Sequence, residues 1–198
     1  MKGSTIDPHY RQEIRGFGQH EAGHYVVARL LGFKTDGLKL EILDLNGAHR
    51  GESGLHLVRE LHTVDDILNY LEDRVQILYA GALGESLTNG KVDDKKATET
   101  LEERGGQNDC AKARELIQLI RNIRYPKTKD KNGIQRNLDE IKIDLWKKSI
   151  SLVEENQDII CVLGNRLASE SKVVGESVVL NEDELETLPV IREKFHKV

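Results

Sequence analysis

The residues with the clearest chemical potential lie in one short segment, His20-Glu21-Ala22-Gly23-His24. On a helix, side chains four positions apart lie on one face, so both imidazoles can bind the same metal ion. Glu21 lies on the same side, about 60° around the helix axis from His24, within reach of a water molecule beside that metal. The pattern predicts Zn²⁺ held by His20 and His24, with Glu21 as the general base that activates a zinc-bound water.

A catalytic zinc ion usually has three protein ligands and one open position, so a third ligand is expected outside this segment. Residue types and their spacing leave several candidates for it. These candidates are His49, His56, His62, Glu85 and Asp109. For each of the three histidines, a solvated position on the surface is the simpler interpretation.

The helix that carries the motif is expected to run from near Pro8 to Leu31, with Asp7 as its N-cap and Gly32 as its stop. Its interior Gly23 costs about 1 kcal/mol relative to alanine, which a helix tolerates where another backbone must come close. We therefore expect the metal-binding segment to lie on a well-formed helix that packs closely against a neighbour.

Two segments predict strands. Apolar and charged residues alternate over 38–42, which is the period of a strand with one buried face. The run Leu55-His56-Leu57-Val58 predicts a second strand, and Asn46-Gly47 predicts a turn before it. Together they indicate a small sheet, which we expect to be antiparallel.

Helical periodicity predicts a long helix over about 63–89, which begins at the capping box Thr63-Val64-Asp65-Asp66 and ends at Gly90. Residues 91–104 are strongly charged and are expected to form either an exposed helix or a mobile loop. Residues 125–133 are polar and are expected to form a loop.

Further helices are expected in the second half of the chain. Asn108 is expected to cap the first of them. A longer helical stretch over about 134–169 should break near Asn156. An extended run over 173–180 should then lead into a short helix that begins at Asn181.

These elements predict a mainly α protein with a small β-sheet, folded as one domain over residues 1–198. The 29 lysines and arginines against 34 acidic residues give a net charge of −5, which argues against a general nucleic-acid-binding protein. No apolar run approaches the about 20 residues of a membrane-spanning helix, and the start of the chain has no apolar signal segment. Cys110 and Cys161, without a Cys-x-x-Cys spacing, indicate a reduced, cytoplasmic protein.

Three segments of the chain, in order, match the motifs of one known family. They are His20-Glu21-Ala22-Gly23-His24 with Val26-Val27-Ala28 after it, Ile77–Gly90, and Gly105–Ala113. Together with the C-terminal run Leu180-Asn181-Glu182-Asp183-Glu184-Leu185, they resemble the peptidase domain of the FtsH-type ATP-dependent zinc metalloproteases. The order and spacing agree over a core of about residues 10–190.

This resemblance implies that His20, His24 and Asp109 bind the zinc ion and that Glu21 is the catalytic carboxylate. It also implies that Glu85 orients a ligand histidine through the second ring nitrogen. A place for Asp109 in the first turn of a helix suits a carboxylate, because the helix dipole is positive there.

The strand with Gly54, Leu55, His56 and Leu57 matches the edge strand that borders the active site in this family. An exposed edge can bind a substrate peptide as an additional strand, through main-chain hydrogen bonds and with weak sequence specificity. An ordinary edge strand, protected by His56 and Arg59, is the alternative interpretation.

The function expected from these features is that of a zinc-dependent endopeptidase acting on peptides or unfolded protein segments. The family's peptidase domain follows an ATPase module and a membrane anchor, whereas this chain contains no G-x-x-x-x-G-K-[ST] motif and no spanning segment. The run Ala80–Glu85 also lacks the arginine of the corresponding family segment. A stand-alone domain is therefore expected. It is expected either to work with a separate ATPase or to form a homo-oligomer. The alternative is a regulatory binding module that keeps the peptidase fold without turnover.

Overall fold

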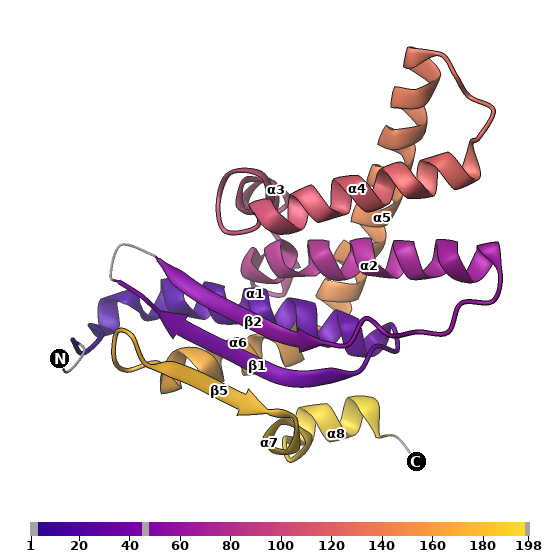
Figure 1. Ribbon diagram of the computed structural model, residues 1–198. Coiled ribbons are helices and arrows are strands. Elements are labelled where there is room, and N and C mark those ends of the chain that lie inside the picture. Colours follow the sequence, from indigo (N-terminus) through magenta and orange to yellow (C-terminus); the bar gives the residue numbers. More distant parts are fainter. Residues whose placement is uncertain (1–3, 45–47, 197–198) are drawn as a thin grey trace.

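The computed structural model describes residues 4–44 and 48–196, so the predicted Asn46-Gly47 turn lies outside the described residues. The chain is mainly helical with a small antiparallel sheet, which confirms the predicted fold class (Figure 1). The helices are α1 (Arg11–Leu30), α2 (Val64–Glu85), α3 (Asp94–Glu103), α4 (Gln107–Arg124), α5 (Lys131–Glu155), α6 (Gln157–Glu170), α7 (Glu182–Glu186) and α8 (Pro189–Phe195). The strands are β1 (Thr35–Ile42), β2 (His49–Leu55), β3 (Leu87–Thr88), β4 (Lys91–Val92) and β5 (Ser177–Asn181).

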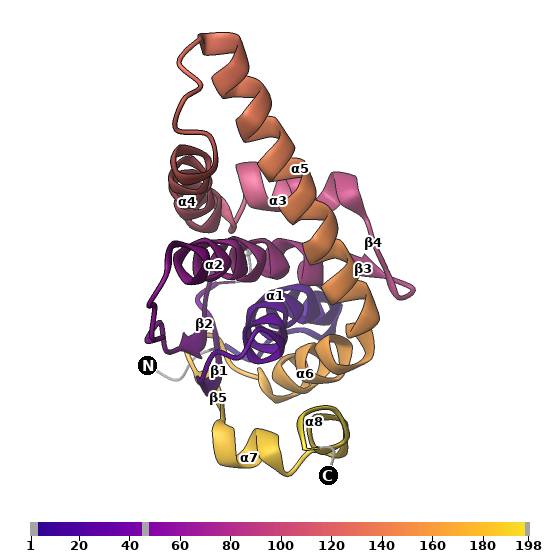
Figure 2. The same ribbon diagram turned by 90° about the vertical axis from the view of Figure 1, so that its right-hand side faces the viewer.

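Helix α1 lies at the centre of the fold, after a short 3₁₀ turn η1 (Pro8–Tyr10). It packs against α2, α6 and the strands β1 and β2, and Figure 2 shows these elements arranged around it. Residues 18–28 of α1 are all buried, including the motif residues His20, Glu21 and His24. The helix predicted for this segment is thus confirmed, except that its first turn is 3₁₀.

Glycines let α1 come very close to both neighbouring helices. A Cβ atom on Gly23 would lie 2.2 Å from the backbone oxygen of Ala80 in α2. A Cβ atom on Gly18 would lie 2.8 Å from the backbone oxygen of Gly164 in α6. No side chain fits at such distances, so the close backbone approach expected at Gly23 is confirmed.

The larger sheet has the strand order β2-β1-β5, and both of its pairs are antiparallel. Leu38, Leu40 and Ile42 of β1 are buried, which confirms the alternation predicted over 38–42. β2 is an outer strand of this sheet and pairs only with β1 among the described strands.

The prediction of a strand over 55–58 is wrong, because β2 ends at Leu55. His56 follows the strand, and its ring Nε2 is hydrogen-bonded to the Asp36 carboxylate at 2.6 Å. Leu57 and Val58 are 49% and 92% exposed, so their apolar character does not reflect burial. The true strand contains few apolar residues, since an edge strand buries little of its surface.

Two helix ends also differ from the prediction. α2 ends at Glu85 rather than near Asn89, because Asn89 and Gly90 have positive φ (51° and 77°) and form the turn between β3 and β4. α4 has Gly106 as its N-cap, so Asn108 lies inside the helix and is not its cap.

The charged segment 91–104 forms β4 and α3, and α3 buries Ala97, Thr100 and Leu101 against its neighbours. The polar loop predicted for 125–133 is shorter, because α5 begins at Lys131. Four further signals are confirmed: the Asp7 cap, the capping box at Thr63 and Asp66, the break at Asn156, and the helix that begins at Asn181. The extended run predicted over 173–180 forms a strand only from Ser177, because Val174 and Gly175 lie in a turn before β5. Within the described residues, no helix combines the length and apolar composition needed to cross a bilayer.

Candidate metal centre

Three side chains from two helices converge at one point. His20 and His24 extend from the middle of α1, and Asp109 extends from the first turn of α4. The Asp109 Oδ2 atom lies 3.1 Å from His24 Nε2 and 3.7 Å from His20 Nε2, and the three ligand atoms all lie within 4.8 Å of one another. Ligand atoms around a tetrahedral zinc ion are about 3.3 Å apart, so these three residues can hold a metal ion after small side-chain movements.

Helix α2 holds the second nitrogen of each imidazole. His20 Nδ1 is hydrogen-bonded to Glu85 Oε2 at 3.0 Å, and His24 Nδ1 is hydrogen-bonded to the backbone oxygen of Ile77 at 2.7 Å. A backbone oxygen only accepts, so His24 donates from Nδ1, and its Nε2 keeps a lone pair for a metal ion when the ring is neutral. An ionised Glu85 orients the His20 ring in the same way.

Gly81 of α2 provides the space in which the two imidazoles lie. A Cβ atom on Gly81 would be 2.3 Å from His24 Nε2 and 2.6 Å from His20 Nε2. Gly81 is not among the site residues predicted from the sequence. The available signal was the run of small residues over 80–82, which allows α1 side chains to lie directly against the α2 backbone.

The buried acids and histidines control one another's protonation. Burial lowers the pKa of His20, but its contacts with Asp109 and Glu85 and the charge of Glu21 outweigh this and raise the pKa to about 10. Burial raises the pKa of Asp109, but its hydrogen bonds to the two histidines outweigh this and hold the pKa well below its usual range. With no cation between them, His20 therefore carries a proton at neutral pH, and a divalent cation must displace that proton to bind.

The Glu21 carboxylate lies against β2, beside the three ligand atoms. A Cβ atom on Gly51 would be 2.0 Å from Glu21 Oε1, so a side chain at this position of the strand would displace the carboxylate. Glu21 is not one of the three residues whose ligand atoms converge. It lines the same cleft as His20, His24 and Asp109.

The other histidine candidates have different contacts. His49 stacks on the ring of Phe17, with centroids 3.6 Å apart, and this holds the start of β2 onto α1. His56 is hydrogen-bonded to Asp36, and the ring of His62 lies 3.4 Å from the Glu60 carboxylate. Of the five candidates for the third ligand, the structure therefore brings only the aspartate among the ligand atoms.

An open cleft of about 590 Å³ leads to the histidines. The start of α4 lines one side of it and residues 49–53 of β2 line the other, while the α1 motif lies between them. Gly54, Leu55, His56 and Leu57 do not line the cleft. The part of the edge that borders the candidate metal centre is therefore residues 49–53 of β2, not the segment predicted from the sequence.

The hydrogen bond between Glu85 and His20 predicts that Glu85 affects the affinity for Zn²⁺. Glu85→Ala should weaken Zn²⁺ binding by about 10–100-fold, because the ring loses the group that orients it and raises its basicity. Glu85→Gln should weaken binding less, since its amide oxygen still accepts from Nδ1. Competition with a chromogenic chelator measures the affinity, and the exposed Glu103→Ala serves as the control. Equal affinities for the Glu85→Ala variant and the control would contradict this role.

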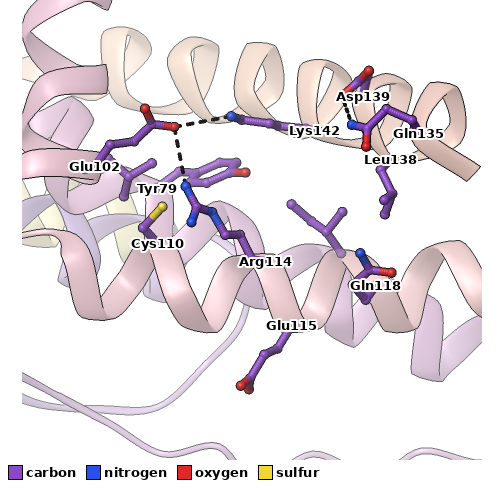
Figure 3. A pocket seen from close by; sticks show the side chains of 12 residues that line it. Tyr79, Glu102, Cys110, Arg114, Glu115, Gln118, Gln135, Leu138, Asp139 and Lys142 are labelled. Carbon is purple, nitrogen blue, oxygen red and sulfur yellow. Dashed lines mark hydrogen bonds and ion pairs between the residues drawn. The ribbon is translucent and has the colours of Figure 1, made fainter.

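A second hollow, of about 440 Å³, lies between α3, α4 and α5 (Figure 3). The Glu102 carboxylate lies 3.8 Å from Arg114 and 3.5 Å from Lys142 at this hollow, so all three charged groups have an ion-pair partner. His20, His24 and Asp109 do not line it.

Comparison of the chain with models of known protein families found no match, and comparison with curated proteins found none either. What the site can do is therefore judged from its own geometry. It combines three converging ligand atoms, a nearby carboxylate that is not a ligand, and an open cleft beside a strand edge.

Proposed function

We propose that this chain is a zinc-dependent endopeptidase, related to the peptidase domain of the FtsH-type ATP-dependent zinc metalloproteases as its sequence motifs imply. The observation that carries the proposal is the convergence of His20, His24 and Asp109 in an open cleft, with Glu21 beside them. Two imidazoles and one carboxylate suit Zn²⁺, and three protein ligands leave one coordination position open for catalysis.

The residues around the centre have separate roles in this reaction. A zinc ion bound there supplies a Lewis acid for the scissile carbonyl and lowers the pKa of water. Glu21 removes a proton from the attacking water and delivers it to the leaving amine. Glu85 and the backbone oxygen of Ile77 keep the two imidazoles oriented through their Nδ1 atoms.

The edge of β2 supports binding of the substrate backbone. An extended segment laid along residues 49–53 would add a strand to the sheet and pass directly beside Glu21. Only a chain without stable structure can adopt that conformation, so the proposed substrates are peptides and unfolded protein segments. A separate ATPase that unfolds proteins is a fitting partner for such an enzyme.

A regulatory module that binds metal without turnover is less well supported. A structural zinc site is closed by a fourth protein ligand, whereas the described residues supply three and the cleft opens beside them. We place the enzyme in the cytoplasm, because Cys110 and Cys161 are both free thiols.

Reconstitution with metal tests the proposed function. Protein stripped with a chelator should not cleave unfolded casein or a fluorogenic peptide library, and one equivalent of Zn²⁺ should restore cleavage. Metal content and rate are measured on the same sample, with His24→Ala as the variant that loses a ligand. Stoichiometric zinc without cleavage of any substrate would favour the regulatory module instead.

A further inference from the structure

The cleft beside the candidate metal centre is lined by three cationic side chains without an acidic partner among the described residues. They are Lys39 of β1, Arg50 of β2 and Lys112 of α4. None of them makes an ion pair or side-chain hydrogen bond with another described residue. Two of the cations lie on the sheet side of the cleft and one on the helix side, so they lie on both sides of a segment bound along β2.

Three acidic residues, Glu21, Glu52 and Asp109, line the same cleft, so only a bound cation gives it an excess of positive charge. Asp109 contacts both histidines, and Glu21 lies next to His20 on the same helix. In the β1–β2 ladder Glu52 is opposite Lys39 and Glu41 is opposite Arg50, yet neither pair comes within ion-pair distance. Once a divalent cation is bound, the cleft carries more positive than negative charge.

This local excess differs in sign from the whole chain, whose net charge is −5. Unpaired charges of one sign along a cleft concentrate a field that attracts groups of the opposite sign and repels like charges. Repulsion between a cationic cleft and a cationic ligand lowers the affinity for that ligand, even where attraction to an anionic ligand adds little affinity.

We propose that the cleft selects substrate segments with acidic side chains near the scissile bond. The inference rests on the proposed peptidase function and names its substrate class. Successive side chains of an extended segment point to opposite sides. An acidic residue therefore meets Arg50 and Lys39 in one register and Lys112 in the next.

Matched peptides test this selection. Three peptides share one sequence and carry glutamate, glutamine or lysine on each side of the cleaved bond. The zinc-loaded enzyme should prefer glutamate over lysine by about tenfold in kcat/KM, mainly through KM, and the preference should shrink with added salt. The double variant Arg50→Glu/Lys112→Glu should reverse the order, while Lys147→Glu, an exposed charge reversal on α5, should keep it. Equal rates on all three peptides, or an unchanged order in the double variant, would overturn the inference and leave the peptidase function intact.

Binding separates this inference from the peptidase function itself. Fluorescence anisotropy with zinc-loaded Glu21→Gln measures the affinity of each labelled peptide without any cleavage. About tenfold tighter binding of the acidic peptide supports the inference even where the wild-type protein cleaves nothing and the proposed function fails. Equal or undetectable binding of the acidic and basic peptides overturns it.

Discussion

Replacing Glu21 by glutamine is expected to lower kcat for peptide hydrolysis by about 10²–10⁴-fold while one zinc ion per chain stays bound. Glutamine has nearly the same shape, so it fits between α1 and Gly51 of β2, where a larger side chain would not. It cannot accept the proton of the attacking water, because its amide is not basic. His20, His24 and Asp109 are unchanged, so the zinc ligands remain.

The measurement pairs steady-state kinetics with metal analysis of the same preparation. Glu13→Gln removes an exposed carboxylate from the first turn of the same helix and should leave both zinc content and kcat unchanged. Full activity of zinc-loaded Glu21→Gln would contradict the role of Glu21 as general base. Loss of zinc together with activity would instead assign Glu21 to the metal ligands.

Replacing Gly81 by alanine is expected to weaken Zn²⁺ binding by more than about 100-fold and to abolish hydrolysis with it. The new methyl group would lie 2.3 Å from His24 Nε2 and 2.6 Å from His20 Nε2, so both imidazoles must move away from Asp109. The clash is with the ends of two side chains rather than with backbone, so the helices can keep their packing. Alanine also favours a helix over glycine by about 1 kcal/mol, which supports folding of the variant.

Gly16→Ala is the matched control for this substitution. Its methyl group would lie 3.5 Å from the nearest atom, Glu85 Cγ, which is an ordinary contact. This variant should bind zinc normally and unfold at a slightly higher temperature. Thermal unfolding and a zinc titration of both variants distinguish loss of the centre from loss of the fold. Normal zinc affinity in folded Gly81→Ala would show that the imidazoles do not need this space.

Patterns within one helix were predictable, because helical geometry alone places residues four apart on the same face. This applies to His20 and His24, to the α1 helix that carries them, and to the caps at Thr63 and Asn181. Each of these features depends on neighbours within a few residues. Such interactions are formed largely by the segment itself.

The sheet edge was less predictable, since burial there is weak. The segment His49–Leu55 has a single apolar residue, at its end. The neighbouring run over 55–58 is more apolar, so the strand was predicted there instead. What makes residues 49–55 a strand is pairing with β1 and the stacking of His49 on Phe17. Both are contacts with distant parts of the chain.

The sequence by itself determined the motif, its helix and the mainly helical class. Asp109 was predicted as a ligand only through a family resemblance, because residue types and spacing left five candidates open. Only the tertiary structure distinguishes them, because α2 packs between α1 and α4 and brings Asp109 to the two histidines. From α2, Glu85 and the Ile77 backbone oxygen bind the two imidazoles, and Gly81 leaves the space in which they lie. The physical reason is that residue spacing within a helix determines on which face each side chain lies. Which residues of two different helices meet depends instead on how closely small residues let the helix backbones approach.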